Sequence, residues 1–185
     1  MTVASTGSNN VGVGSGALLA VTTGAGNVAL GAGALDGTDD GHNNVAIGYG
    51  ALSANVGDGS VAIGQGAGAA YTANQLVAIG QGAANSCTNV GNTAIGHMAM
   101  NQHTTGARNI AIGYGAMNGT AGDADDAPAS TDNVFLGYDA GGGDWENDED
   151  SNFNVGIGNY CMDAAMDGAL NNTAVGYSAL TALTS

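Results

Sequence analysis

A nine-residue word that recurs ten times constrains this 185-residue chain more than any other feature. The word reads Asn, Val, Ala, Ile, Gly, variable, small, Ala, Leu or Met, and we number its positions as slots 1 to 9. The copies start at Asn10, Asn27, Asn44, Ser60, Leu76, Asn92, Asn109, Asn133, Asn154 and Asn172. The intervals between starts are nearly equal as far as Asn109, and the last three intervals are longer. Such a period predicts stacked coils, one per copy, in a single repeat domain over residues 1–185.

Slots 2 to 5 have the pattern of a short strand followed by a sharp turn. Aliphatic residues at slots 2 and 4 alternate with Ala or Gly at slot 3, where only Phe135 is large. Gly fills slot 5 in all ten copies, which indicates a positive φ or a contact too tight for a Cβ. A helix is disfavoured, because each Gly inside one costs about 1 kcal/mol relative to Ala. We therefore expect an all-β fold, a parallel β-solenoid of about ten coils.

The side chains inside such a coil are expected to be small. We expect Val, Ile and Ala in the interior, with the Ala of slot 8 pointing inward. The row of Ala at slot 3 indicates close approach of either another wall of the coil or another chain. Asn at slot 1 is expected to hydrogen-bond to its counterparts along the solenoid axis.

The charge balance excludes several classes of partner. The chain carries 16 acidic residues and a single basic one, Arg108, for a formal charge of −15. It therefore lacks the cations needed to bind nucleic acid or an anionic membrane surface, and no apolar run is long enough for membrane insertion. Without Lys there is no phosphate-loop lysine or Schiff base, and no Ser, His and Asp grouping stands out. We expect no enzymatic activity and no cofactor.

The repeat words resemble those of known fibrous proteins. Asn44-Val-Ala-Ile-Gly is similar to the head repeats of trimeric autotransporter adhesins. Asn172-Thr-Ala-Val-Gly-Tyr-Ser-Ala-Leu resembles even more closely the repeats of bacteriophage tail fibres. The resemblance implies a left-handed parallel β-roll that assembles with itself as a homotrimer. It also implies a structural or adhesive segment of a virion fibre, either shaft or receptor-binding head. The alternative is the head domain of a bacterial trimeric adhesin at the cell surface, and the absence of a signal peptide at residues 1–7 favours the virion.

The variable slot 6 predicts one candidate contact surface. Stacking would align its residues into a ladder that includes Tyr114, Tyr138 and Tyr177. Tyr is suited to contacting a host cell-surface glycan or protein, because its ring is apolar and its hydroxyl is polar. The alternative is that the ladder packs between subunits or caps the turn.

Two acidic insertions, residues 119–132 and 141–152, interrupt the period and predict loops. Trp145 in the second insertion is a candidate for stacking on a sugar, or for folding over the rod. Three carboxylates around it are candidate Ca²⁺ ligands, although the Gly and distal Glu of an EF-hand loop are missing; they are Asp144, Glu146 and Asp148. The alternative is a solvated acidic loop without metal.

Two further sets of polar residues are expected to be structural. We expect a plain turn, rather than a metal site, where four polar residues gather between the second and third coils: Asp36, Asp39, Asp40 and His42. Cys87 and Cys161 lie about four coils apart, roughly 19 Å along the axis, which is too far for a disulfide within the chain. We expect Cys161, in the small slot 8, to be a buried small hydrophobe.

Overall fold

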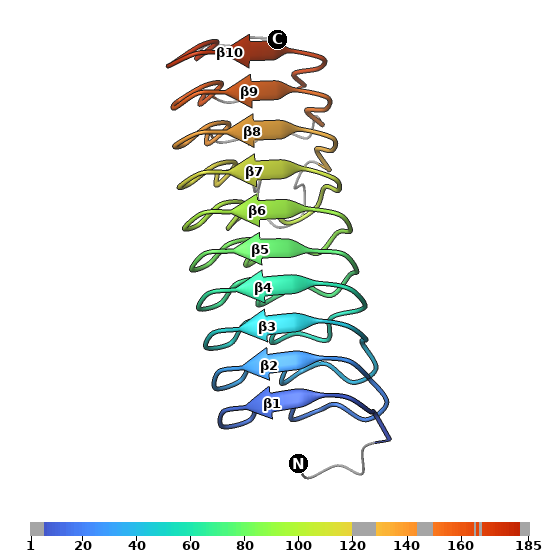
Figure 1. The fold of residues 1–185 in the computed structure, drawn as a ribbon. Coiled ribbons are helices and arrows are strands. Elements are labelled where there is room, and N and C mark those ends of the chain that lie inside the picture. Colours follow the sequence, from blue (N-terminus) through green and yellow to red (C-terminus); the bar gives the residue numbers. More distant parts are fainter. Residues whose placement is uncertain (1–5, 120–128, 144–149, 165, 167, 182–185) are drawn as a thin grey trace.

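The chain folds into a single parallel sheet of ten short strands (Figure 1). The structure, a computed structural model, describes residues 6–119, 129–143, 150–164, 166 and 168–181. Each strand has three residues: β1 (Val11–Val13), β2 (Val28–Leu30), β3 (Val45–Ile47), β4 (Val61–Ile63), β5 (Val77–Ile79), β6 (Thr93–Ile95), β7 (Ile110–Ile112), β8 (Val134–Leu136), β9 (Val155–Ile157) and β10 (Thr173–Val175). The strands lie side by side in sequence order, and each slot pairs with the same slot of the next coil, as in Ala46 with Ala62. The predicted all-β parallel solenoid is confirmed.

Both physical reasons for the invariant Gly at slot 5 are present. Its φ lies between 133° and 146° in all ten coils, a region that L side chains rarely adopt. A Cβ on Gly80 would also lie 2.4 Å from the carbonyl oxygen of Gly96 in the next coil. The same clash recurs from Gly14 to Gly158, so the glycine is required by the stacking as well as by the turn.

Among the strand residues, only those of slot 3 line the interior of the coil. The middle residue of each strand from β2 to β10 is buried, whereas no residue of slot 2 or slot 4 is buried in any strand. The expectation that Val and Ile lie inside was therefore wrong: the pleat turns slot 3 inward and directs both aliphatic neighbours outward. Slot 8 is inward as predicted, and Ala34 through Ala140 are fully buried there, as is Cys161. The row of small residues at slot 3 faces the inside of the coil.

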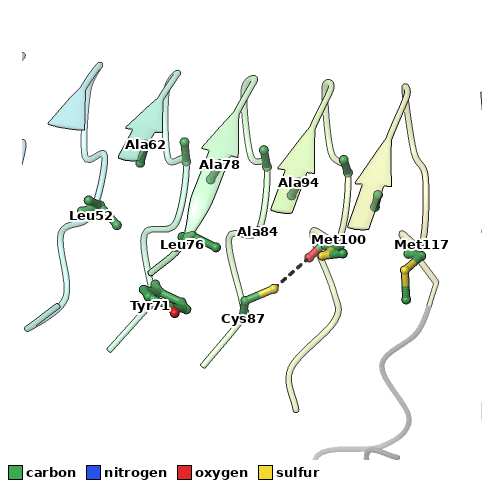
Figure 2. Close-up of a cluster of buried hydrophobic side chains, with 14 of the residues drawn as sticks. Leu52, Ala62, Tyr71, Leu76, Ala78, Ala84, Cys87, Ala94, Met100 and Met117 are labelled. Atoms are coloured by element: carbon green, nitrogen blue, oxygen red, sulfur yellow. Dashed lines mark hydrogen bonds between the residues drawn. The ribbon is translucent and has the colours of Figure 1, made fainter. Parts of the chain in front are cut away.

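Slot 9 supplies many of the large side chains of the core. Its residues have φ near 50° and are buried apolar side chains in most coils, namely Leu18, Leu35, Leu52, Ala84, Met100, Met117 and Met162. Two coils have Gly at slot 9, and each has a large side chain elsewhere that fills the vacant space. A Cβ on Gly68 would meet Leu76 at 2.8 Å and Leu52 at 2.9 Å. Figure 2 shows the side chains of Leu52 and Leu76 among the buried residues of the core. A Cβ on Gly141 would meet the Phe135 ring at 2.8 Å, which explains the one bulky residue at slot 3.

The slot 1 residues form the predicted ladder along the axis. From Asn10 to Asn154, the side-chain Oδ1 of each slot 1 Asn accepts a hydrogen bond from the backbone N–H of slot 1 in the next coil, as from Asn44 to Asn27 (2.9 Å). In coil 4 the Ser60 hydroxyl oxygen accepts in the same way, and Leu76 in coil 5 interrupts the ladder. The Nδ2 of these Asn residues donates to a backbone carbonyl at the end of the same coil, three residues before the next slot 1, as from Asn27 to Gly41 (2.8 Å). In coils 8 to 10 the Nδ2 also donates to the Oδ1 of the preceding Asn at 3.1 Å. The ladder thus satisfies backbone groups that are buried between coils.

Cys87, Cys161 and His103 are buried, as the sequence predicted for Cys161. Both cysteines are free and buried, and burial raises the pKa of the Cys87 thiol to about 12. His103 is buried beside Asn109, whose Nδ2 lies 3.1 Å from its Nε2. Burial lowers the pKa of His103 to about 4, so the imidazole is neutral at pH 7.

Candidate functional site

The outward side chains of the sheet form an apolar surface that runs the length of the solenoid. We call this surface, made of the slot 2 and slot 4 side chains of β1–β10, the outer strand face. It carries two aliphatic or Thr residues per coil, because the pleat directs both flanking residues of each strand away from the interior. The exposed fraction of these residues is 56% at Val13, 37% at Ile63 and 69% at Val175. Monomeric proteins rarely expose a contiguous apolar patch of this extent.

A second surface lies just beyond the carboxyl ends of the strands. Five aromatic side chains from five consecutive coils form a stacked row that we call the aromatic stripe: His97, Tyr114, Tyr138, Tyr160 and Tyr177. Successive ring centroids are 5.0, 5.2, 5.2 and 5.9 Å apart. The coils that carry it follow one another from β6 to β10 at the C-terminal end of the rod (Figure 1). The three tyrosines predicted from slot 6 are therefore brought together, and each is exposed.

Sequence reasoning missed Tyr160 as a member of this stripe. In its coil Asn159 occupies slot 6, and Tyr160 occupies slot 7, which is Gly in most coils. The Asn159 side chain accepts a hydrogen bond from the Tyr138 backbone N–H (3.0 Å), while the Tyr160 ring continues the row. The replacement of the usual slot 7 Gly by Tyr, in the one late coil without an aromatic slot 6, was the signal that could have found it.

The ring orientations change along the stripe. His97, Tyr114 and Tyr138 are stacked nearly parallel, with interplanar angles of 13° and 7°. Tyr160 is turned by 62° from Tyr138 and by 79° from Tyr177. Burial, followed by the neighbouring Tyr138, raises the pKa of the Tyr160 hydroxyl above its ordinary value.

The side chain of Asp139 lies next to the stripe. Asp139 follows Tyr138, and its backbone N–H donates to the Tyr114 carbonyl at 2.9 Å. Burial, together with the charge of Asp163, raises the pKa of Asp139 above its ordinary value. Asp139 therefore places one carboxyl group beside the stripe, close enough to act on Tyr160.

The one basic side chain of the chain is already paired. Arg108 makes a two-point contact with Asp132, with Nε to Oδ1 and Nη2 to Oδ2 distances of 2.7 Å each. The two residues directly precede slot 1 in successive coils, and hydrogen bonding to Arg108 holds the pKa of Asp132 below its usual range. No cation is left to neutralise an anionic ligand along the described part of the rod.

The predicted Ca²⁺ candidates in the second insertion stay a prediction. Asp144, Trp145, Glu146 and Asp148 all lie outside the part of the chain that the structure describes. The polar cluster before the third coil is a hydrogen-bonded turn, in which the Thr22 hydroxyl donates to Asp39 and the Ala25 N–H donates to His42 Nδ1 (3.0 Å). Among the described residues, no three His, Cys, Asp or Glu side chains gather as they would around a metal ion.

These features define the chain as a parallel β-solenoid with an apolar outer strand face and an aromatic stripe. No helix in the described ranges is long and apolar enough to cross a membrane. A scan against protein-family models, a search of curated proteins and a search of solved structures each found no match to this chain.

Proposed function

We propose that this chain is a segment of a trimeric virion fibre, a left-handed β-roll that contributes to the length of the fibre and to contact with the host. The observation that carries the proposal is the outer strand face. A solenoid whose Val and Ile side chains point outward on every coil needs a partner of the same length and the same spacing. A second and third copy of the chain, arranged in parallel around one axis, meet both requirements.

The composition supports this function. Asp and Glu supply 16 charges against one from Arg108, so an assembled trimer would carry a high negative charge outside its apolar centre. Such a charge keeps a long rod soluble and keeps separate rods apart. The resemblance of the repeats to phage tail-fibre repeats supports the same assignment, and we assign the chain no catalytic role.

Solution mass tests the trimer directly. We expect light scattering to give a mass of three chains, unchanged on dilution. Ile63→Asp is expected to convert the trimer to a species of one chain, because three added charges in one layer would face one another at an apolar centre. The matched control is Thr72→Asp, which adds the same charge at an exposed position of the same coil, off the strand. A wild-type chain that stays folded with the mass of one chain at every concentration refutes the trimer.

Attachment is tested with the intact assembly. Fluorescently labelled trimer is incubated with a panel of bacterial strains, and binding to a subset of strains supports contact with the host. A trimer that binds no strain is a shaft rather than a receptor-binding head. The alternative function, the head of a bacterial adhesin, predicts that the full gene also encodes an export signal and a membrane anchor, and that antibodies against the chain label bacterial surfaces rather than virus particles.

A further inference from the structure

The aromatic stripe is not needed to build the coil. Slot 6 holds Ser15 in the first coil and Ala32 in the second, and both coils have the same strand pairing and the same slot 5 turn. Gln65 and Gln81 occupy the slot in coils 4 and 5. A run of aromatic residues in the last five coils therefore calls for a reason other than folding.

The stripe presents two kinds of contact to a ligand. The nearly parallel rings of His97, Tyr114 and Tyr138 cover one another's faces, so they offer their edges, and the two tyrosines also offer phenolic hydroxyls on neighbouring coils. The Tyr160 ring is turned by 62° from Tyr138 and by 79° from Tyr177, so its face is not stacked on the face of either neighbour. A ring face with a nearby row of hydroxyls matches a sugar chain, whose rings have apolar faces and hydroxyl-bearing edges.

Charge selects among the possible sugar chains. The chain has a formal charge of −15, and its one cation, Arg108, is bound to Asp132. Asp139, beside Tyr138, adds a carboxylate that can accept hydrogen bonds from hydroxyl groups. An anionic polymer would be repelled by this surface, whereas an uncharged one would not.

We propose that the aromatic stripe binds an uncharged glycan chain that lies along the solenoid axis. This inference rests on the proposed function, because it names the class of host molecule that the fibre contacts. The four ring-to-ring steps span about 20 Å at the coil spacing of about 4.8 Å, so the site takes several linked sugars rather than one. The hydroxyls of Tyr114 and Tyr138 and the face of Tyr160 are the expected contacts.

The test is titration calorimetry of the purified full-length assembly with uncharged hexasaccharides of glucose and of N-acetylglucosamine. A hexasaccharide of galacturonic acid serves as the anionic comparison. We expect at least one uncharged probe to bind, and the anionic probe to bind more weakly. Tyr138→Ala and Tyr160→Ala are each expected to weaken binding by about tenfold or more, as the loss of a central aromatic contact does. Tyr160→Phe keeps the ring and is expected to lose less.

Tyr49→Ala is the matched control. Tyr49 occupies slot 6 and is exposed, but its neighbours in that slot are Ala32 and Gln65, so it stands outside the aromatic stripe. Its replacement is expected to leave the affinity unchanged. Binding that falls equally in this variant overturns the assignment to the stripe, and so does the absence of binding by both uncharged probes.

The light-scattering mass of the same samples separates this inference from the proposed function. A trimer that attaches to cells but binds neither uncharged probe refutes the glycan inference and leaves the fibre proposal standing. A single-chain species that binds an uncharged probe through Tyr138 and Tyr160 refutes the trimeric fibre and supports the glycan site. If Tyr138→Ala instead breaks the trimer into single chains, the stripe is a subunit contact and the glycan inference is wrong.

Discussion

Replacing Gly80 with Ala tests the idea that the coil spacing leaves no room for a Cβ at slot 5. The φ of Gly80 is 133°, and a non-Gly residue in such a region costs about 1–3 kcal/mol. The new Cβ would lie 2.4 Å from the Gly96 carbonyl oxygen, about 1 Å closer than an ordinary van der Waals contact. Moving the next coil away by that amount would stretch the 2.7 Å hydrogen bond from the Gly96 N–H to the Ile79 carbonyl beyond bonding distance, at a cost of about 1 kcal/mol. We expect Gly80→Ala to cost about 3–5 kcal/mol in total.

Gly50→Ala is the control for the backbone conformation alone. Gly50 also has a positive φ, 61°, but a Cβ there would have no heavy atom within 4 Å. The expected cost is therefore only that of a left-handed conformation, about 1–2 kcal/mol.

Urea unfolding followed by far-ultraviolet circular dichroism, at one fixed protein concentration, measures both variants. A difference of about 2 kcal/mol or more between them supports the steric contribution of the stacked coil, since overpacking and a lost hydrogen bond together cost about that much. Equal costs for Gly80→Ala and Gly50→Ala would refute it, and would leave the turn conformation as the sole reason for the invariant glycine.

Three other predictions concern the coil interior. Because burial lowers the pKa of His103 to about 4, the unfolded chain binds a proton at a higher pH than the folded one, and stability should fall as the pH drops from 6.5 towards 4. Urea unfolding at pH 7 and pH 5 is expected to show a loss of about 2 kcal/mol that is absent in His103→Gln. Gly141→Leu should destabilise the chain by about 2–4 kcal/mol, because the new side chain clashes with the Phe135 ring. The same change in a Phe135→Ala background should be tolerated. A double-mutant cycle in thermal or urea unfolding measures this coupling. Asn133→Ala leaves the buried N–H of Asn154 without its 2.9 Å acceptor and should cost about 1–3 kcal/mol in urea unfolding, whereas an unchanged midpoint would contradict a structural role for the ladder.

The sequence predicted the architecture well because each slot has one dominant physical requirement. The Gly of slot 5, the Asn ladder of slot 1 and the inward Ala of slot 8 were all predicted from residue type and period, and the structure confirms them. These requirements are local to two neighbouring coils, so a single sequence contains the information needed to infer them.

The direction of the strand faces was harder to predict. Alternation shows that slots 2 and 4 share a face, but it does not show whether that face is inside. Val and Ile are usually interior residues, so slots 2 and 4 were predicted to face the inside of the coil. This was wrong, because the narrow coil has room only for the Ala of slot 3 between its walls and the aliphatic residues lie outside. The size of the slot 3 residues could have indicated the correct direction. A residue on a free outer surface can vary in size, whereas slot 3 is Ala or Gly in nine of the ten coils.

The aromatic stripe was predicted in part. Tyr114, Tyr138 and Tyr177 follow from slot alignment, whereas Tyr160 belongs to a different slot and joins them only through the turn geometry after its strand. A ladder built from a fixed slot number cannot include a side chain that reaches the same row from the adjacent slot.

The insertions leave the sheet register unchanged. The interval between copies is longer after Asn109 and after Asn133 than in the earlier coils, yet Ile110 still pairs with Val134, and Val134 still pairs with Val155. Extra residues enter only between slot 9 of one coil and slot 1 of the next, where they do not interrupt the hydrogen bonds between strands. A gene of this kind can therefore change in two independent ways. Duplication of a coil would lengthen the rod by a fixed increment of about 4.8 Å. Insertions between slot 9 of one coil and slot 1 of the next would change the loops on the rod without changing its length.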